Sequence, residues 1–530
     1  SAWYTAEELA GFYLKEVVRQ AEEAIKASDA QGARIEEVVF TYPVLFSDSQ
    51  VAAIGRILGK RIGIPRVHRS LDEANAGAIR FVYAEALEEL HRLKKGIASG
   101  ATSAARRRTE YVINYDFGGG TIDIALLRLD YDFDAERVVS TPIGVTGFYR
   151  FGGEDVTVVV RDIVLEKIRK RVPRVRIPCG DPDLHPAEYE AIRGNNYLLW
   201  FLAETAKKGI YTDPRTYRVD PDGGFFNDLM VDSGRGLEPV GPQNPLFRGL
   251  ADEAARVTIT RDEVDERIRD RVAASIERAY NLWRFTLAHG QLGLEGGARP
   301  DRVILTGRSS SIPLVAELFA KRFGLAADKI VFRPDQAKRV VVEGACFYRA
   351  FESAAIEGLE FLVGDAASRI PVPLGIQKTV HGRPCFAPLF LNGQPLELDP
   401  EATKRLGEKV YSASRVEELR LDRPVVYVKI CRNLNYTDEV DLRSGAEKIG
   451  FFEIRREDPF FADWPDEALR RVPCRFRLEK RPGSGRYSIE AIFTRPDGIE
   501  KALEFHFEDH YLAAVPEGEE ATGGGSDKGA

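Results

Sequence analysis

The sequence predicts a mixed α/β protein of several domains, in which the last domain is all-β. The chain has 530 residues, too many for one core, so three or more domains are expected. Up to about residue 365, helical periodicity alternates with short apolar runs. Beyond that point, short alternating runs separated by turn residues replace the helices. Near the middle of the α/β part, Tyr115 to Asp123 places three consecutive glycines between two apolar runs.

The composition argues against several classes of protein. No apolar run approaches the roughly 20 residues needed to span a bilayer, and we expect neither a signal peptide nor a membrane partner. The formal charge of −7 argues against a nucleic-acid partner, and we interpret the basic run Arg106–Arg108 as a solvated loop. Five scattered cysteines indicate reduced thiols in a cytoplasmic protein, and the seven histidines give no metal-site pattern.

The elements of the α/β part follow from periodicity and capping signals. We expect an amphipathic helix over 6–28, a strand at Val38–Tyr42, a helix over 49–58, a longer helix over 72–95 and a flexible loop over 96–110. A helix follows Gly153 to about Lys170, and the Pro- and Gly-rich stretches 171–196 and 212–250 are expected to be surface insertions. Thr260 and Glu263 form a capping box for a helix to about 287, followed by a strand at Arg302–Thr306 and a helix over Ile312–Phe323.

The all-β part is predicted from period-two alternation. The predicted strands are Val425–Ile430, Phe451–Ile454, Arg475–Leu478, Tyr487–Phe493 and Leu503–Phe507. A sandwich of about 140 residues fits them. The residues from 513 to 530 are expected to be a disordered tail.

The glycine-rich stretch is read as a β-hairpin with a tip of bare backbone. Gly118, Gly119 and Gly120 would let N–H groups point into one concavity that a phosphate can approach. Asp116 and Asp123 could hold a hydrated Mg²⁺ beside that phosphate, directly or through water. The alternative is an ordinary glycine-rich turn with two flanking acids.

Four motifs in order carry a family resemblance. They are Thr41–Gln50, the hairpin with Phe151-Gly152-Gly153-Glu154-Asp155 after it, Glu204-Thr205-Ala206-Lys207-Lys208, and Ile304–Pro313. The series resembles the nucleotide-binding domain of the seventy-kilodalton heat-shock (DnaK-like) chaperones. The resemblance implies an actin-like ATPase fold of the ribonuclease H-like class, N-terminally incomplete, followed by an all-β sandwich. The implied domains are a remainder of the first lobe (1–115), a second lobe (116–358), a linker (359–370) and a substrate-binding-like sandwich (371–512).

The resemblance also implies roles for individual residues around ATP or ADP and Mg²⁺. Thr121 would lie near the attacking water, and Asp116, Asp123 and Glu73 would be the catalytic acids. Asp116 and Asp123 would also hold the metal through water. The nucleotide-binding positions implied are Gly118, Gly119, Gly120, Gly152, Gly153, Glu204, Lys207, Lys208, Gly307, Arg308, Ser309 and Asp335. Glu204, Lys207 and Lys208 share one helix side, although a surface Glu–Lys pair has the same spacing.

The sequence departs from the family pattern at several positions. Arg308 stands where the family has a glycine, and Ser311 replaces an arginine that stacks on adenine, a contact worth ~0.5–2 kcal/mol. Ala74 replaces a proline, and Val51 replaces an arginine implicated in interdomain signalling. No first phosphate loop and no catalytic lysine match, and no helical lid follows the sandwich. We therefore expect a first-lobe sheet with an open edge, completed either by more of a longer chain or by another subunit.

Three functions remain open at this point. The first is an atypical heat-shock-type chaperone, in which an ATP-binding module is coupled to a sandwich that binds a polypeptide client or a dedicated protein partner. The second is a nucleotide-sensing pseudo-ATPase scaffold without turnover, which Arg308, Ser311 and the unmatched lysine favour. The third, a sugar kinase or filament-forming relative, is disfavoured by the β domain after residue 365. ATP hydrolysis is expected only for the complete family site.

Overall fold

A computed structural model describes most of the chain. It covers residues 4–28, 34–43, 46, 48–95, 106–148, 151–171, 173, 176–212, 216–219, 224–232, 234, 236–241, 257–334, 337, 339–352, 358–364, 368–440, 445–462, 464–482 and 486–508. The predicted tail at 513–530 and the candidate residue Asp335 lie outside these ranges.

A six-stranded sheet forms the centre of the α/β part. Its order is β11 (Ile330–Phe332), β10 (Arg302–Thr306), β3 (Arg107–Phe117), β4 (Ile122–Asp132), β5 (Arg137–Phe148) and β12 (Glu360–Val363). The hairpin strands β3, β4 and β5 are antiparallel, and the outer strands join them in parallel. Successive side chains of β3 are buried in different clusters, Val112 on one face and Ile113 on the other, so helices must cover both faces.

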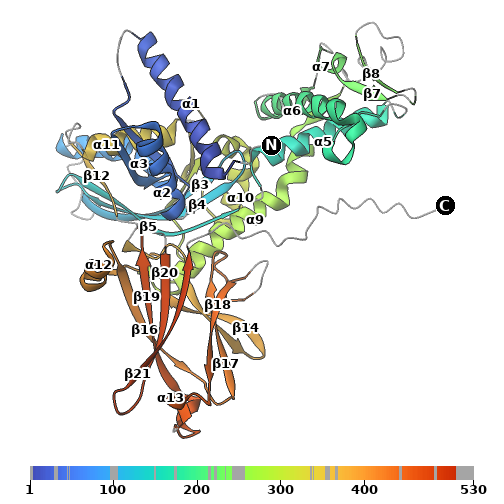
Figure 1. The fold of residues 1–530 in the computed structure, drawn as a ribbon. Helices are drawn as coiled ribbons and strands as arrows, with labels where there is room; N and C mark the ends of the chain where they lie inside the picture. Colours follow the sequence, from blue (N-terminus) through green and yellow to red (C-terminus); the bar gives the residue numbers. More distant parts are fainter. Residues whose placement is uncertain are drawn as a thin grey trace.

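Helices cover both faces of this sheet (Figure 1). On one side α3 (Glu73–Lys94) packs beside α11 (Val340–Glu352). On the other lie α5 (Gly153–Arg171), α9 (Arg261–Ala288) and α10 (Pro313–Phe323). The predicted capping box is present at α9, where the Thr260 hydroxyl accepts the Glu263 N–H and the Glu263 carboxylate accepts the Thr260 N–H.

The N-terminal elements form a small layer above α3 and α11. They are α1 (Ala6–Ala27), β1 (Glu37–Tyr42), α2 (Asp48–Arg56), the π-helical turn η1 (Ile57–Ile62) and β2 (Arg66–Asp72). β1 and β2 pair only with each other among the described residues, which leaves the open sheet edge that the sequence predicted. α1 packs lightly on η1 and leaves Leu9, Phe12 and Tyr13 exposed, Tyr13 by 70%.

A second helical unit projects from α5 on the other side of the molecule (Figure 1). It is built on α6 (Tyr189–Tyr211) with two small ribbons and short turns. These are β6 (Thr216–Arg218) with β9 (Thr258–Thr260), β7 (Met230–Asp232) with β8 (Leu237–Pro239), α7 (Gly224–Asn227), η2 (Pro182–Leu184) and η3 (Pro186–Glu188). The described parts of 171–196 and 212–250 bury Ile177, Phe226 and Val231 against it.

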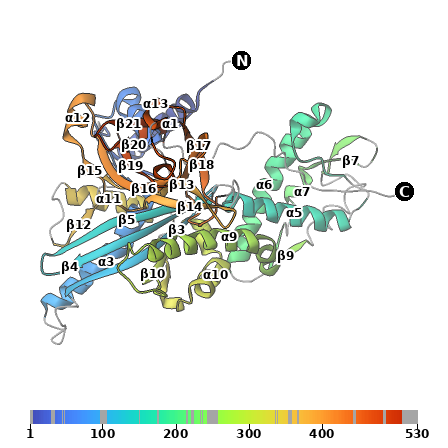
Figure 2. The same ribbon diagram turned by 90° about the horizontal axis from the view of Figure 1, so that it is seen from below.

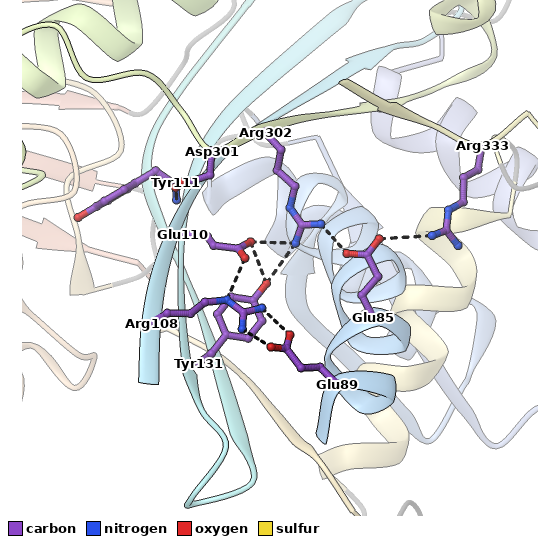
Figure 3. A network of polar contacts seen from close by, with 9 residues as sticks. All are labelled: Glu85, Glu89, Arg108, Glu110, Tyr111, Tyr131, Asp301, Arg302 and Arg333. Carbon is purple, nitrogen blue, oxygen red and sulfur yellow. Dashed lines mark hydrogen bonds and ion pairs between the residues drawn. The ribbon is translucent and has the colours of Figure 1, made fainter. Parts of the chain in front are cut away.

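The basic run Arg106–Arg108 is not the solvated loop that we predicted. Arg107 and Arg108 begin β3, and Arg108 pairs with Glu89 of α3 at 2.8 Å and with Glu110 at 3.1 Å. Figure 3 shows the network that it joins: Arg302, 14% exposed, pairs with Glu85 and Glu110, and Tyr131 donates to Glu110. Arg106 and Arg107 remain exposed, whereas Arg108 is half-buried because Glu89 of α3 lies opposite it. The network fixes α3, and with it Glu73, on the sheet.

The C-terminal part is the predicted β-sandwich. One sheet has the order β14 (Arg383–Phe390), β13 (Leu374–Val380), β17 (Val425–Arg432), β18 (Glu447–Arg455). The other has the order β15 (Glu397–Leu398), β16 (Tyr411–Leu419), β19 (Val472–Arg481), β20 (Arg486–Thr494), β21 (Glu500–Glu508). The short helices of the sandwich are α12 (Pro400–Leu406), α13 (Pro459–Ala462) and η7 (Ala468–Arg470). Two further short turns, η4 (Arg308–Ser311) and η5 (Ala327–Lys329), belong to the α/β part. Inward side chains of both sheets, such as Ile376 and Leu478, share one core.

The sandwich is docked tightly on β5 and the end of α9. The Tyr436 hydroxyl donates to the Val145 carbonyl at 2.8 Å and accepts the Val145 N–H at 3.2 Å. Asn392 donates to the Ile143 carbonyl at 3.1 Å and to the Thr286 hydroxyl at 3.0 Å. The predicted linker 359–370 begins as a strand: Leu359 and Phe361 are buried, and Glu360–Val363 pairs with β5. An apolar stretch of this length is compatible with a linker and with a strand. It forms a strand here because it pairs with the edge of β5.

In the part of the chain that the structure describes, no helix is both long and apolar enough to cross a bilayer.

Candidate nucleotide-binding site

The glycine hairpin has the predicted strand–turn–strand geometry. β3 and β4 pair in register up to Phe117 and Ile122, which sets Asp116 directly opposite Asp123. The turn closes where the Gly118 N–H donates to the Thr121 carbonyl at 3.0 Å. Gly119 and Gly120 are exposed, and a Cβ added at Gly120 would meet nothing within 4 Å. The tip therefore presents open backbone, as a phosphate loop requires.

The Gly152-Gly153 turn packs against this hairpin through backbone alone. The Gly153 N–H donates to the Gly118 carbonyl at 2.9 Å, and the Glu154 N–H donates to the Gly119 carbonyl at 2.7 Å. A Cβ at Gly152 would overlap the Gly119 carbonyl and lie 2.5 Å from the Gly120 Cα. Gly153 begins α5, so the amino end of a helix lies beside the hairpin, where its dipole favours an anion.

A third glycine turn, between β10 and η4, meets the same hairpin. Gly307 has φ of 77°, and a Cβ there would overlap Asp116 Oδ1 and lie 2.6 Å from the Phe117 carbonyl carbon. Ser309 Oγ donates to the Gly118 carbonyl at 3.1 Å. The Arg308 side chain, which the sequence placed near the nucleotide, is exposed. Three turns thus bring unobstructed backbone together at one end of β3 and β4.

The three predicted residues of α6 lie together beside this cradle. Glu204 pairs with Lys207 at 2.5 Å and with Lys208 at 3.3 Å. Lys207, only 16% exposed, also donates to the Gly153 carbonyl at 2.9 Å and to the Thr157 hydroxyl at 2.7 Å. The Lys207 hydrogen bonds therefore link α6 to α5, whereas Lys208, 61% exposed, remains available to a ligand.

Three predicted carboxylates gather on the α3 side of the hairpin. Burial raises the pKa of Glu73 to about 8, and repulsion by Asp116 and Asp123 adds to the effect. Burial also raises the pKa of Asp116 to about 6 and that of Asp123 to about 7, with the Asp116 charge adding to the latter. Thr121 Oγ1 donates to Asp123 Oδ2 at 3.1 Å. All three groups resist ionisation because they are desolvated, and Glu73 and Asp123 are also repelled by Asp116. A bound cation would relieve both effects.

The residues fit a hydrated magnesium ion. Asp123 Oδ1 and Asn114 Oδ1 are buried without a hydrogen-bond partner, and the buried Thr306 hydroxyl lies beside the Asp116 carboxylate. Register places all three side chains on one face of the sheet around Asp116: Asn114 two residues before it, Asp123 opposite it on β4 and Thr306 beside it on β10. Among the described residues no three His, Cys, Asp or Glu side chains cluster as direct ligands. Asp116 and Asp123 supply two carboxylates, and the acceptor atoms around them can receive hydrogen bonds from metal-bound water. This arrangement suits Mg²⁺, which keeps most of its waters when it binds to proteins.

Sequence reasoning missed four residues of this region. Asn114 and Thr306 are fully buried beside Asp116, Thr157 joins α5 to Glu204 at 2.7 Å, and Asp72 caps α3 by accepting the Asn75 N–H at 2.8 Å. Asn114 carried a signal, because it is the one polar residue in the apolar run Tyr111–Tyr115.

Replacing Glu73 with glutamine should stabilise the ligand-free chain at about pH 8. The folded chain keeps Glu73 protonated up to about pH 8, whereas the unfolded chain ionises it above its ordinary pKa of 4.5. Stability therefore falls as the pH rises between these values, and Glu73→Gln removes that loss. We expect a gain of about 2 kcal/mol in unfolding free energy at about pH 8 and little change at about pH 5.

Urea unfolding in EDTA at the two pH values measures this gain. Glu88→Gln on the exposed side of α3 is the matched control and should change neither value by more than about 0.5 kcal/mol. A loss of stability for Glu73→Gln at both pH values would contradict the account.

Parts of the chain are similar to known proteins. Residues 2–174 match the family model described as "Hsp70 protein". "Chaperone protein DnaK" of Buchnera aphidicola subsp. Schizaphis graminum is 25% identical over 317 residues, which cover 59% of this chain and 39% of that protein. "Chaperone protein DnaK" of Thermotoga petrophila is 24% identical over 379 residues, covering 71% of this chain and 49% of that protein.

The matched segments span less than half the length of these curated relatives. The family model ends before the α6 and Gly307 motifs, but the relatives extend the similarity over more of the chain. The matches agree with the actin-like ATPase fold predicted from the motifs. Over these segments the chain is similar to the Hsp70 family and to DnaK chaperones.

Proposed function

We propose that the chain is an atypical heat-shock-type chaperone, whose ATP-binding module is joined to a β-sandwich that binds a polypeptide client or a dedicated protein partner. The single observation that carries the proposal is the meeting of three glycine turns, at Gly118, Gly152 and Gly307, beside the Asp116–Asp123 pair. Bare backbone and paired carboxylates are the two things that a magnesium-bound triphosphate needs. The cysteines, all five of them free, support a cytoplasmic location as part of the same proposal.

Each residue of the site has a role in this proposal. The N–H groups of the glycine tip and the start of α5 hold phosphate oxygens, and Lys208 with Glu204 contacts the nucleoside. Asp116 and Asp123 hold Mg²⁺ through water, and the ion supplies positive charge beside the phosphates when bound. Thr121 is kept in position by its hydrogen bond to Asp123, where its hydroxyl can orient a water. Glu73 faces the same space, and its raised pKa of about 8 keeps it protonated at neutral pH in the ligand-free chain.

The N-terminal layer supports a complementing segment. β1 has an edge without a strand partner among the described residues, and α1 above it exposes Leu9, Phe12 and Tyr13. A free edge and an apolar helix face together favour pairing with more polypeptide. We propose that this segment carries the first phosphate loop, whether it belongs to a longer form of this chain or to another subunit.

The sandwich offers a surface for an extended apolar chain. Tyr427 and Phe451 make an edge-to-face pair with ring centroids 5.5 Å apart, and both are about half exposed. Val425 lies two residues before Tyr427, on the same face of β17. We call Val425, Tyr427 and Phe451 the outer aromatic patch. Exposed aromatic pairs on a rigid sheet are typical of peptide-contacting surfaces.

Fluorescence anisotropy of a labelled, extended apolar peptide tests the proposal. The chain should bind the peptide, and ATP with Mg²⁺ should weaken that binding. Tyr427→Ser with Phe451→Ser should remove it, whereas Ile499→Ser, at an equally exposed position outside the patch, should not. Peptide binding that the patch variant leaves intact, or no peptide binding at all, would overturn the chaperone proposal.

A pseudo-ATPase scaffold is the second candidate. The observation in its favour is that Tyr436 and Asn392 fix the sandwich on β5. A sandwich held in this way has little freedom to move in response to a bound nucleotide. A scaffold would bind nucleotide without turnover, and its peptide or partner affinity would be the same with and without ATP.

A further inference from the structure

The helices α9 and α10 run side by side (Figure 2). A cavity lies at their carboxyl ends. It has a volume of about 750 Å³ and lies between the last turns of both helices and the loop that joins α9 to β10. We call it the basic aromatic pocket. Its floor is formed by Tyr280, Trp283 and Phe323, and its rim by Arg284, Arg299, Lys321 and Arg322.

The floor of the pocket is held rigidly. Trp283 Nε1 donates to the Ala298 carbonyl at 2.9 Å, which fixes the joining loop against α9. Tyr280 and Phe323 pack edge to face with centroids 5.3 Å apart. The Arg322 guanidinium lies 3.3 Å from the Tyr280 ring centroid and is held by both oxygens of Glu277, at 2.5 and 2.7 Å. A pre-formed aromatic surface needs little ordering when a ligand binds.

The rim carries uncompensated positive charge. Among the described residues, Arg284, Arg299 and Lys321 have no carboxylate within 4.0 Å, and the nearby Glu277 is engaged by Arg322. Arg299 donates only to the Gly324 carbonyl. Glu295 of the joining loop is exposed and does not pair with them. Within the described residues, three cations without a carboxylate partner therefore line the pocket, in a chain whose formal charge is −7.

The pocket is separate from the nucleotide site. α10 has 11 residues, so its two ends lie about 16 Å apart along the helix axis. Gly307 and Ser309 lie before its first residue, and the pocket lies at its last. None of the residues assigned to the nucleotide or the metal lines the pocket.

Helix polarity decides which anion the pocket suits. Both α9 and α10 end there, at Ala288 and Phe323, so their carbonyl groups rather than their N–H groups face the region. The carboxyl ends of helices attract cations and oppose anions, a compact doubly charged phosphate more strongly than a singly charged carboxylate. Carboxylates spaced along a chain can reach the separate rim cations while apolar side chains cover the floor between them.

We propose that the basic aromatic pocket binds an acidic peptide segment of a partner protein. Carboxylates of the segment pair with Arg284, Arg299 and Lys321. An aromatic or aliphatic side chain between them packs on the accessible parts of Tyr280, Leu287 and Ala288 above the buried Trp283 and Phe323. The volume suits a few residues of an extended segment. This places a partner at the carboxyl ends of α9 and α10, away from the nucleotide site.

Anisotropy of a labelled peptide of alternating Glu, Leu and Phe, titrated with the full chain, tests this. We expect a Kd of about tens of micromolar at low salt and a loss of at least tenfold in affinity at high salt. Arg284→Glu with Lys321→Glu should also weaken binding at least tenfold. Both side chains are exposed, so the fold should survive, and circular dichroism checks it. Lys321→Ala alone provides a milder second variant, with an expected loss of a few-fold.

The controls separate charge from position. Arg193→Glu, at an exposed arginine of α6 outside the pocket, should leave the affinity unchanged. A peptide with Lys in place of Glu should not bind. Equal binding by the double variant would overturn the proposal. So would displacement of the peptide by inorganic phosphate or ATP at comparable concentration, or preferential binding of the chain to anionic vesicles through these residues, because each assigns the pocket to another ligand.

Discussion

Gly152→Ala should abolish nucleotide binding and lower the free energy of unfolding by about 3 kcal/mol. The added Cβ would lie 2.5 Å from the Gly120 Cα and would overlap the Gly119 carbonyl. Both neighbours are backbone atoms within a hydrogen-bonded turn, so neither can rotate away as a side chain would. The Gly152-Gly153 turn must separate from the hairpin, and the phosphate cradle opens.

Gly120→Ala is the matched control for that variant. A Cβ at Gly120 meets nothing within 4 Å, and its φ is not in the left-handed region. The stability of this variant should stay within about 0.5 kcal/mol of the unchanged chain. Its nucleotide affinity should still fall, because the new methyl group occupies the space where a phosphate approaches. Urea unfolding and calorimetric titration measure the two effects, and equal stability losses in both variants would show that the turns do not pack as described.

Gly393→Ala should release the β-sandwich from the ATPase module. Gly393 has φ of 70°, and a Cβ there would lie 2.6 Å from the Ile143 carbonyl oxygen of β5. The adjacent Asn392 makes two of the buried hydrogen bonds of the interface, so a shift of this turn breaks them together. Losing several buried hydrogen bonds and their packing costs about 3 kcal/mol or more. We expect the radius of gyration to increase and two unfolding transitions to replace one.

Gly407→Ala is the control that distinguishes the effect of backbone strain from the loss of the interface between the sandwich and β5. Gly407 has φ of 72°, but a Cβ there would meet nothing within 4 Å. Both variants therefore carry the same left-handed strain, and only Gly393→Ala also disturbs the interface. Small-angle scattering of the two variants should show expansion for Gly393→Ala alone. Expansion of both, or of neither, would contradict the described interface.

Elements with local signals could be predicted from the sequence. The capping box at Thr260 and Glu263 specified the start of α9, and β10 has the predicted bounds Arg302–Thr306. In the sandwich, period-two alternation located strands such as Val425–Arg432 within two residues. These features are encoded within a few residues of each other, so no knowledge of distant partners was needed.

What could not be predicted depends on partners far away in the chain. Glu360–Val363 is a strand because β5 has a free edge, and Arg108 is half-buried because Glu89 lies opposite it. Asn114 and Thr306 line the metal region only because β10 pairs with β3 in one register. At the candidate site, the glycine turns lie close to Glu204, Lys207 and Lys208, and Lys207 is engaged by protein groups. Asp335 lies outside the described residues.

Calorimetric titration of ATP with Mg²⁺ into this chain tests the central claim most directly. The account predicts binding with a Kd of about micromolar order that Asp116→Ala abolishes and that Asp130→Ala, on the same hairpin, leaves unchanged. A phosphate-release assay alongside should show no turnover until a complementing segment is supplied, and turnover by the chain alone would refute that requirement. Absence of binding by the unchanged chain, or equal binding by Asp116→Ala, would contradict the claim that the three glycine turns and the carboxylate pair form a nucleotide site.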